Sequence, residues 1–127
     1  MRIVSWNIRQ GGGLQSHLIC QQLQARSPDI VGLCEFRGTT PSRSIAAALM
    51  EMGLVYQHST VNPAKHASNR LLLASRWPLY LRAPEGVLAS TGRWIDARVA
   101  AERDLGVILM WVPNRGMHDA SVSPGGA

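Results

Sequence analysis

The segment SPDIVGLCEFR, residues 27–37, decides how this chain folds. Its apolar run is typical of a buried β-strand, which we place at residues 29–35, and both alternating faces of that strand are apolar. Pro28 disfavours helix in the residue before it, so a helix that precedes the strand has to end there. The strand closes on Glu35, a carboxylate whose burial is costly unless it is paired or binds a cation.

Outward from this strand, short apolar strands alternate with two helices. The first helix is expected over residues 14–25. The second is the better marked, because Thr40 can cap it, Pro41 suits its first position and Gly53 suits its C-terminal end. The other strands are expected at residues 2–7, 54–58, 70–75, 86–89, 94–100 and 106–112. The class is therefore α+β, with one mixed β-sheet covered on one face by two helices.

Apolar residues occupy both faces of several strands, so the sheet needs cover on both sides. In the run VILMWV, residues 107–112, Val107 and Leu109 point one way while Ile108 and Met110 point the other. The two helices form one covering layer. Residues 117–127, MHDASVSPGGA, carry little apolar content and are expected to form a flexible tail after a single domain at residues 1–116. We therefore expect a missing segment or a partner chain to cover the second face.

Composition and charge narrow the class of protein. A chain of 127 residues has the length of one small domain, and no apolar run approaches the roughly 20 residues that span a membrane. No signal peptide is evident, so a cytoplasmic protein is expected. Cys20 and Cys34 form no CxxC pair, which argues against a disulfide or a zinc site. The net charge of +5 favours either a polyanionic partner, such as nucleic acid, or a solvated arginine-rich surface.

Asn7 and Glu35 each end a predicted apolar strand, and one predicted helix connects these two strands. Because such a crossover is right-handed and makes the strands parallel, Asn7 and Glu35 should reach the same edge of the sheet, where α/β sheets bind ligands. A single carboxylate suits Mg²⁺ or Mn²⁺, which keep several waters and bind substrate phosphate. On spacing alone, a Glu35 that reaches solvent or pairs with Arg37 is the simpler interpretation.

Five blocks of sequence then occur in order along nearly the whole chain. They are IVSWNIRQGGG (3–13), SPDIVGLCEFR (27–37), NRLLLASRWPL (69–79), TGRWIDARV (91–99) and LGVILMWVPNRG (105–116). Together they resemble the endonuclease/exonuclease/phosphatase family of deoxyribonuclease-like, metal-dependent phosphoesterases. The resemblance implies that the chain is the N-terminal half of a four-layer α/β sandwich.

The resemblance also implies a hydrolase that cleaves a phosphoester with Mg²⁺ or Mn²⁺. Asn7 falls on the active-site Asn of the family, Glu35 on its metal-ligating Glu, and Asn114 on the Asn of its Pro-Asn block. The candidate substrate-binding residues are Asn69, Trp111 and Arg115. At Trp111 the family often has Tyr or His, and the indole N–H of Trp can only donate a hydrogen bond. Without the resemblance, Asn69 and Asn114 are ordinary turn residues.

Two later blocks of the family, Gly-Asp-x-Asn and Ser-Asp-His, do not occur in this chain. The general-base Asp and the catalytic His are therefore absent, and we expect a truncated domain that is weakly active or inactive alone. DNA, RNA, inositol phosphates and sphingolipids all remain possible substrates. The alternative is a non-catalytic module for binding phosphate, nucleic acid or another protein, built on the same half-fold.

Overall fold

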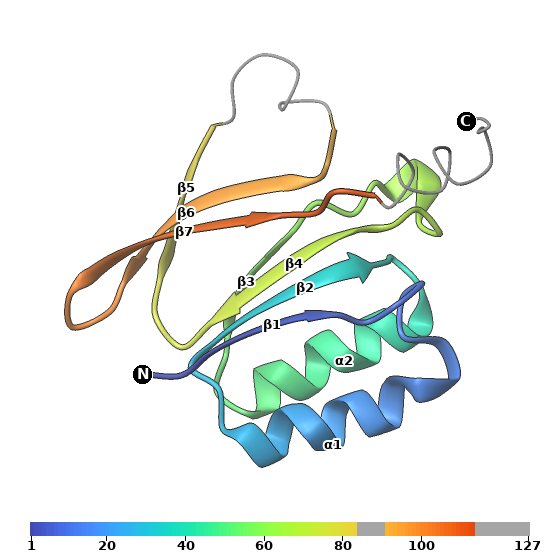
Figure 1. Ribbon diagram of the computed structural model, residues 1–127, viewed down its shortest axis with the longest axis horizontal. Helices are drawn as coiled ribbons and strands as arrows, with labels where there is room; N and C mark the ends of the chain where they lie inside the picture. The colour runs from blue at the N-terminus through green and yellow to red at the C-terminus, as the bar shows by residue number, and fades with distance from the viewer. Residues whose placement is uncertain (84–90, 114–127) are drawn as a thin grey trace, which may run out of the picture.

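A computed structural model describes residues 1–83 and 91–113 of the chain (Figure 1). The elements are, in order, β1 (Ile3–Asn7), η1 (Gly13–Gln15), α1 (Ser16–Arg26), β2 (Ile30–Phe36), α2 (Thr40–Glu51), β3 (Tyr56–Ser59), η2 (Pro63–Lys65), β4 (Arg70–Ser75), β5 (Leu79–Arg82), β6 (Trp94–Ala100) and β7 (Asp104–Met110). The strand predicted at residues 86–89, the two candidates Asn114 and Arg115, and the predicted tail at 117–127 lie outside the described residues.

The strands form two sheets. The four-stranded sheet has the order β1-β2-β4-β3, and the three-stranded sheet has the order β5-β6-β7. β1 and β2 are parallel, as predicted, and the other pairs are antiparallel. The α+β sandwich class is confirmed, but the expected single mixed sheet is divided. The chain passes from the first sheet to the second after β4, through a turn that contains Trp77 and Pro78. This turn leads into β5, a strand that was not predicted from the sequence.

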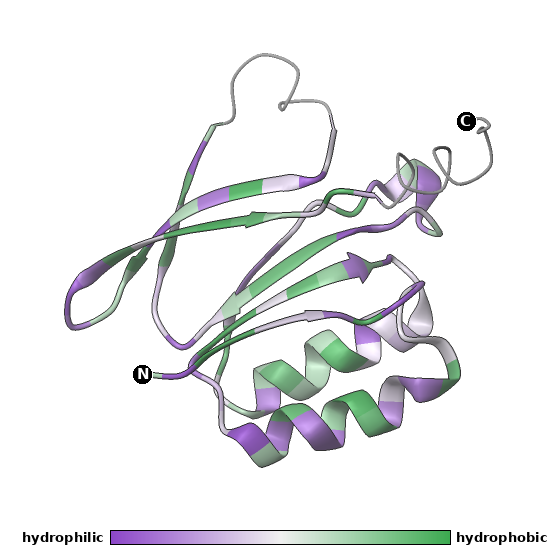
Figure 2. Ribbon diagram, viewed as in Figure 1, coloured by the Kyte–Doolittle hydropathy of each residue, from purple (hydrophilic) through white to green (hydrophobic). Residues whose placement is uncertain are grey.

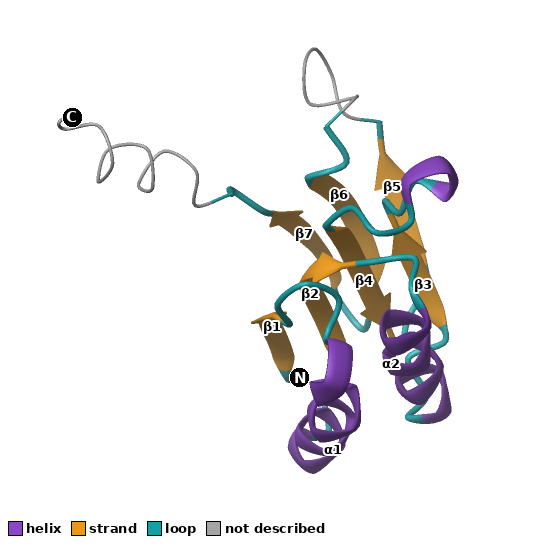
Figure 3. Cartoon of the chain, turned by 90° about the vertical axis from the view of Figure 1, so that its right-hand side faces the viewer, coloured by secondary structure: helices purple, strands orange, loops and turns teal. Residues whose placement is uncertain are grey.

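Both helices pack on one face of the four-stranded sheet, as Figures 1 and 3 show. Each buries one apolar stripe, formed by Ile19 and Leu23 in α1 and by Ile45 and Leu49 in α2. These side chains join one face of β2 and β4 in a common core. The cap of α2 is Thr39, one residue before the predicted cap, and its side chain makes no capping hydrogen bond.

The three-stranded sheet covers the other face of the four-stranded sheet (Figure 2). A second core joins residues from both sheets, namely Ile30, Leu71, Leu73, Ile95, Ala97, Val99 and Leu109. The contact is close at Gly32, where a Cβ atom would lie 2.9 Å from Leu109 Cδ1. On this face of the four-stranded sheet, the cover that we expected from a missing segment or partner comes from the chain itself, whereas Ile108 and Met110 on the outer face of β7 remain exposed. The chain's own strands fold back over it and bury the second apolar side of the pleat.

An ion pair between Asp29 and Arg76 connects the start of β2 to the turn after β4. The Asp29 carboxylate accepts a hydrogen bond from Arg76 Nε at 3.0 Å and another from the Arg2 backbone N–H at 2.7 Å. Both donors, the Arg2 N–H first, lower the pKa of Asp29. Within residues 1–83 and 91–113, no helix is long and apolar enough to cross a membrane.

Candidate active site

Asn7 and Glu35 lie together at the end of the four-stranded sheet, as the predicted parallel pairing requires. The Asn7 side-chain Nδ2 donates a hydrogen bond to Glu35 Oε2 at 2.8 Å. The ends of β1, β2 and β7 and the start of β4 meet at this end of the molecule (Figure 1). The ends of four strands therefore lie together here, and we call this place the catalytic edge, a name that marks it as the candidate site.

The backbone of Glu35 departs from regular strand geometry. The pairing of β2 with β4 has a bulge between Cys34 and Phe36, and Glu35 has a φ of 59°. A bulge re-aims the extra side chain and often lies beside an active site. A non-glycine residue held in the left-handed region is strained, so surrounding contacts have to hold it there. Those contacts come from the loop after β1.

The loop after β1 wraps around the end of Glu35. All five residues from Arg9 to Gly13 have positive φ values, between 47° and 85°. The Gln10 backbone N–H donates to Glu35 Oε1 at 2.9 Å, and the Gly11 N–H donates to the Glu35 carbonyl at 2.7 Å. Among residues 1–83 and 91–113, each carboxylate oxygen of Glu35 thus accepts one side-chain or backbone hydrogen bond and keeps a second acceptor direction.

Ser42 fastens this loop to α2. It is 0% exposed, and its Oγ donates to the Gly11 carbonyl at 2.8 Å and accepts from the Arg37 N–H at 3.0 Å. The sequence reading did not identify Ser42. The available signal was its position three residues before Ile45 and seven before Leu49, which places a hydroxyl on the apolar stripe of the helix.

Ser42→Ala tests whether this hydroxyl stabilises the loop. We expect the free energy of unfolding to fall by about 1–3 kcal/mol, because the Gly11 carbonyl and the Arg37 N–H both lose a buried partner. Denaturant unfolding followed by circular dichroism measures the change. Ser44→Ala is the matched control, since Ser44 is exposed on the same helix, and it should shift stability by no more than about 0.5 kcal/mol. Equal losses in the two variants would contradict this role.

Arg37 and Asn69 also meet at the catalytic edge. The Arg37 Nε donates to Asn69 Oδ1 at 2.7 Å, across 32 residues of sequence. Arg37 is therefore directed to Asn69, and neither ion pair among the described residues involves Glu35. The simpler interpretation from spacing, a Glu35–Arg37 pair, does not match this geometry.

Trp111 lies where the three-stranded sheet approaches the same edge. Its ring packs against the core between the sheets, and the Arg93 guanidinium lies 5.4 Å from the ring centroid. The Trp111 backbone N–H donates to the Arg93 carbonyl at 3.1 Å. Arg70, at the start of β4, donates through Nη1 to the Thr91 carbonyl at 3.1 Å. Trp111 and Arg93 therefore stack near the edge, and Arg70 is hydrogen-bonded to Thr91 before β6.

The donor atoms at this edge fit one kind of metal site. Within the described residues, no three His, Cys, Asp or Glu side chains gather as a metal cluster. Glu35 is a single carboxylate with free acceptor directions, which fits Mg²⁺ or Mn²⁺ held largely by water and substrate oxygens. Burial, and then the charge of Glu35, raise the pKa of the neighbouring Cys34 thiol. Cys34 therefore stays protonated and is a poor ligand.

Solved structures share this fold. An AP endonuclease from Archaeoglobus fulgidus has a TM-score of 0.64 and 20% identity, over 90% of this chain and 42% of its own. An endonuclease/exonuclease/phosphatase from Beutenbergia cavernae has a TM-score of 0.62 and 20% identity, over 96% and 38%. The protein SmcL has a TM-score of 0.61 and 17% identity, over 84% and 46%. The chain thus spans less than half the length of each of these proteins.

Sequence comparison is more specific about the family. No curated protein matches the chain in sequence. The model of the Endonuclease/Exonuclease/phosphatase family matches residues 4–122. This range contains both α-helices and all described strands, apart from Ile3 at the start of β1. The match thus runs through the catalytic edge. This chain belongs to the endonuclease/exonuclease/phosphatase family.

Proposed function

We propose that this chain forms part of the active site of a metal-dependent phosphoester hydrolase, with Glu35 as a ligand of Mg²⁺ or Mn²⁺. Family membership supports a phosphoesterase or nuclease type of function. The observation that carries the proposal is the Glu35 carboxylate, held at a sheet edge by the Asn7 amide and the Gln10 N–H. These two donors orient the carboxylate and leave acceptor directions free for a cation.

Hydrolysis of a phosphoester requires positive charge on the phosphate oxygens and an activated water opposite the leaving group. A bound Mg²⁺ would supply that charge at Glu35. Asn7 would act by orienting Glu35, since its Oδ1 also accepts the Arg9 N–H at 2.9 Å and this fixes the amide. Within the described part of the chain, the Asn69 side-chain NH₂ has no acceptor, which leaves it free to donate to a phosphate oxygen.

The remaining roles complete the proposal. Trp111 would contribute its indole N–H to substrate binding, and the Arg93 guanidinium beside it would add positive charge. Asn114 falls on the Asn of the family's Pro-Asn block and Arg115 follows it, so we propose them as catalytic and substrate-binding residues, respectively. Because the chain spans less than half of the solved structures it resembles, we propose weak or no turnover by this chain alone.

Metal titration tests this function directly. We expect Mn²⁺ to bind at one site per chain in isothermal titration calorimetry, and EDTA to reverse the binding. Hydrolysis of bis(p-nitrophenyl) phosphate with Mn²⁺ should be weak and should stop on addition of EDTA. Absence of saturable Mn²⁺ binding by folded protein would contradict the proposal. If the same protein then bound a short DNA tightly without metal, a non-catalytic binding module would be the better description.

A further inference from the structure

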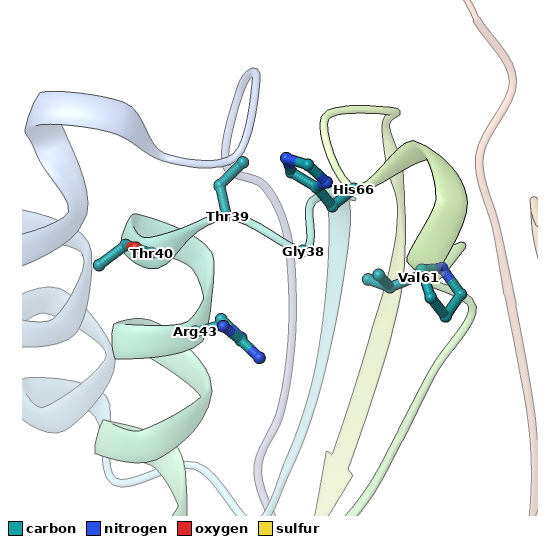
Figure 4. Close-up of a pocket in the computed structure, with 7 residues that line it drawn as sticks. Gly38, Thr39, Thr40, Arg43, Val61 and His66 are labelled. Atoms are coloured by element: carbon teal, nitrogen blue, oxygen red, sulfur yellow. The ribbon is translucent and has the colours of Figure 1, made fainter.

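A cavity of about 650 Å³ lies beside α2, and neither Asn7 nor Glu35 lines it. It opens between the first turn of α2 and the segment that contains η2 (Figure 4). Its lining residues are Gly38, Thr39, Thr40, Arg43, Val61, Pro63 and His66. None of them is a carboxylate, and the set includes one guanidinium, one imidazole and two hydroxyls.

Gly38 lies between the two walls of this cavity (Figure 4). Its N–H donates to the His66 carbonyl at 2.7 Å. A Cβ atom on Gly38 would lie 2.8 Å from Val61 Cγ1 and 2.9 Å from His66 Cβ, so a larger residue there would push the walls apart. In Figure 4, Arg43 extends from α2 and His66 comes from the segment on the other side of Gly38. The two cationic or ionisable groups therefore belong to opposite walls that are held together.

The side chains of Arg43, His66 and Thr39 in this cavity form no hydrogen bond or ion pair with other residues in the part of the chain that the structure describes. The Arg43 guanidinium takes part in neither of the ion pairs there, and the His66 ring makes no hydrogen bond to the described residues. The Thr39 side chain forms no capping bond with α2. A guanidinium that is not neutralised by a carboxylate attracts anions, and its planar fork of N–H donors matches an oxyanion.

A second hollow of about 310 Å³ extends the first, since both are lined by Gly38, Arg43 and Val61. It reaches Arg37, whose Nε contacts Asn69 at the catalytic edge. The guanidinium groups of Arg37 and Arg43 thus both line this second hollow. Positive groups arranged along a concave surface concentrate anionic ligands there.

We propose that this cavity is a phosphate-binding site, with Arg43 as its main cationic contact and His66 and the Thr39 hydroxyl as further donors. A phosphate offers several acceptor oxygens to these donors and suits the guanidinium fork. Neither Glu35 nor a metal ion takes part. This phosphate site is therefore distinct from the proposed metal site, and each of the two proposals can be tested without the other.

Titration of the whole chain with inorganic phosphate, without metal, tests the proposal. Nuclear magnetic resonance should show saturable shifts of the His66 ring protons and of the Thr39 and Thr40 amides. Arg43→Gln should weaken phosphate binding at least about tenfold, since a charge-assisted hydrogen bond is lost. Lys65→Gln removes the same charge from a neighbouring residue that does not line the cavity, and it should change the affinity less than about twofold.

Two further measurements identify the site and the source of the phosphate. Glu35→Gln should leave phosphate binding unchanged, which separates this proposal from that of the metal site. Dimethyl phosphate distinguishes the sources: equal binding indicates an internal phosphodiester, and much weaker binding indicates a terminal or free phosphate. The proposal is overturned if no saturable shifts occur at these residues, if Arg43→Gln and Lys65→Gln weaken binding equally, or if Glu35→Gln abolishes it.

Discussion

Replacing Glu35 by glutamine is expected to abolish Mn²⁺ binding to this chain. Glutamine keeps the length of the side chain and one acceptor oxygen, but it removes the negative charge that a hard divalent cation requires. Loss of an outer-shell partner already costs about 10–100-fold in metal affinity, so loss of the ligand itself should exceed about 100-fold. Isothermal titration calorimetry measures the affinity, and circular dichroism verifies that the variant is folded.

The matched control for this experiment is Glu51→Gln. Glu51 is an exposed carboxylate at the end of α2, far along the chain from the hydrogen bonds that hold Glu35. It should leave the Mn²⁺ affinity within about twofold, because exposed charges interact only weakly through water. If Glu35→Gln bound Mn²⁺ as well as the unchanged chain does, Glu35 would not be the ligand. The strained strand end would then need another explanation.

Leu73→Ala is expected to cause the largest loss of stability. Leu73 is 1% exposed and lies in the core between the two sheets. Truncation of a buried leucine costs about 2–5 kcal/mol, from lost burial and from the cavity that remains. Chemical denaturation gives the free energy of unfolding. A loss of this size requires the three-stranded sheet to cover the four-stranded sheet, whereas an open face would make the same truncation nearly neutral.

Ile108→Ala provides the comparison for Leu73→Ala. Ile108 is 56% exposed on β7, where alternate residues point away from the core between the sheets. We expect a cost of at most about 1 kcal/mol, mainly from the lower strand propensity of alanine. Losses below about 1 kcal/mol for both variants would mean that the sheets do not pack on each other in solution.

Much of the catalytic edge could be predicted because it depends on local pattern and chain handedness. The apolar runs around Ile30 and Leu72 specify strands by their composition and length, and Pro28 ends the helix before β2 by a steric clash. One helix between two such strands makes them parallel. That rule alone predicted that Asn7 and Glu35 meet, and the 2.8 Å contact between their side chains agrees with it.

The missed features all depend on contacts between distant parts of the chain. The alternation in residues 107–112 showed that both faces were apolar, but it could not show which part of the chain would cover them. The Arg37–Asn69 contact spans 32 residues and the Ser42–Gly11 contact spans 31. The left-handed backbone at Glu35 lies at the bulge opposite β4, and the loop after β1 donates hydrogen bonds to this residue from Gln10 and Gly11.

The sequence by itself therefore determined every described strand except β5, together with the two helices, the parallel pairing of β1 with β2 and the edge at which Asn7 and Glu35 meet. These features follow from backbone sterics and hydrophobic periodicity, which act over a few neighbouring residues. The tertiary structure alone decided that the strands divide into two packed sheets, that Ser42 fastens the loop after β1, and that Arg43 and His66 line one cavity. Those outcomes depend on how whole elements dock, because docking selects among many pairings that satisfy the same local pattern.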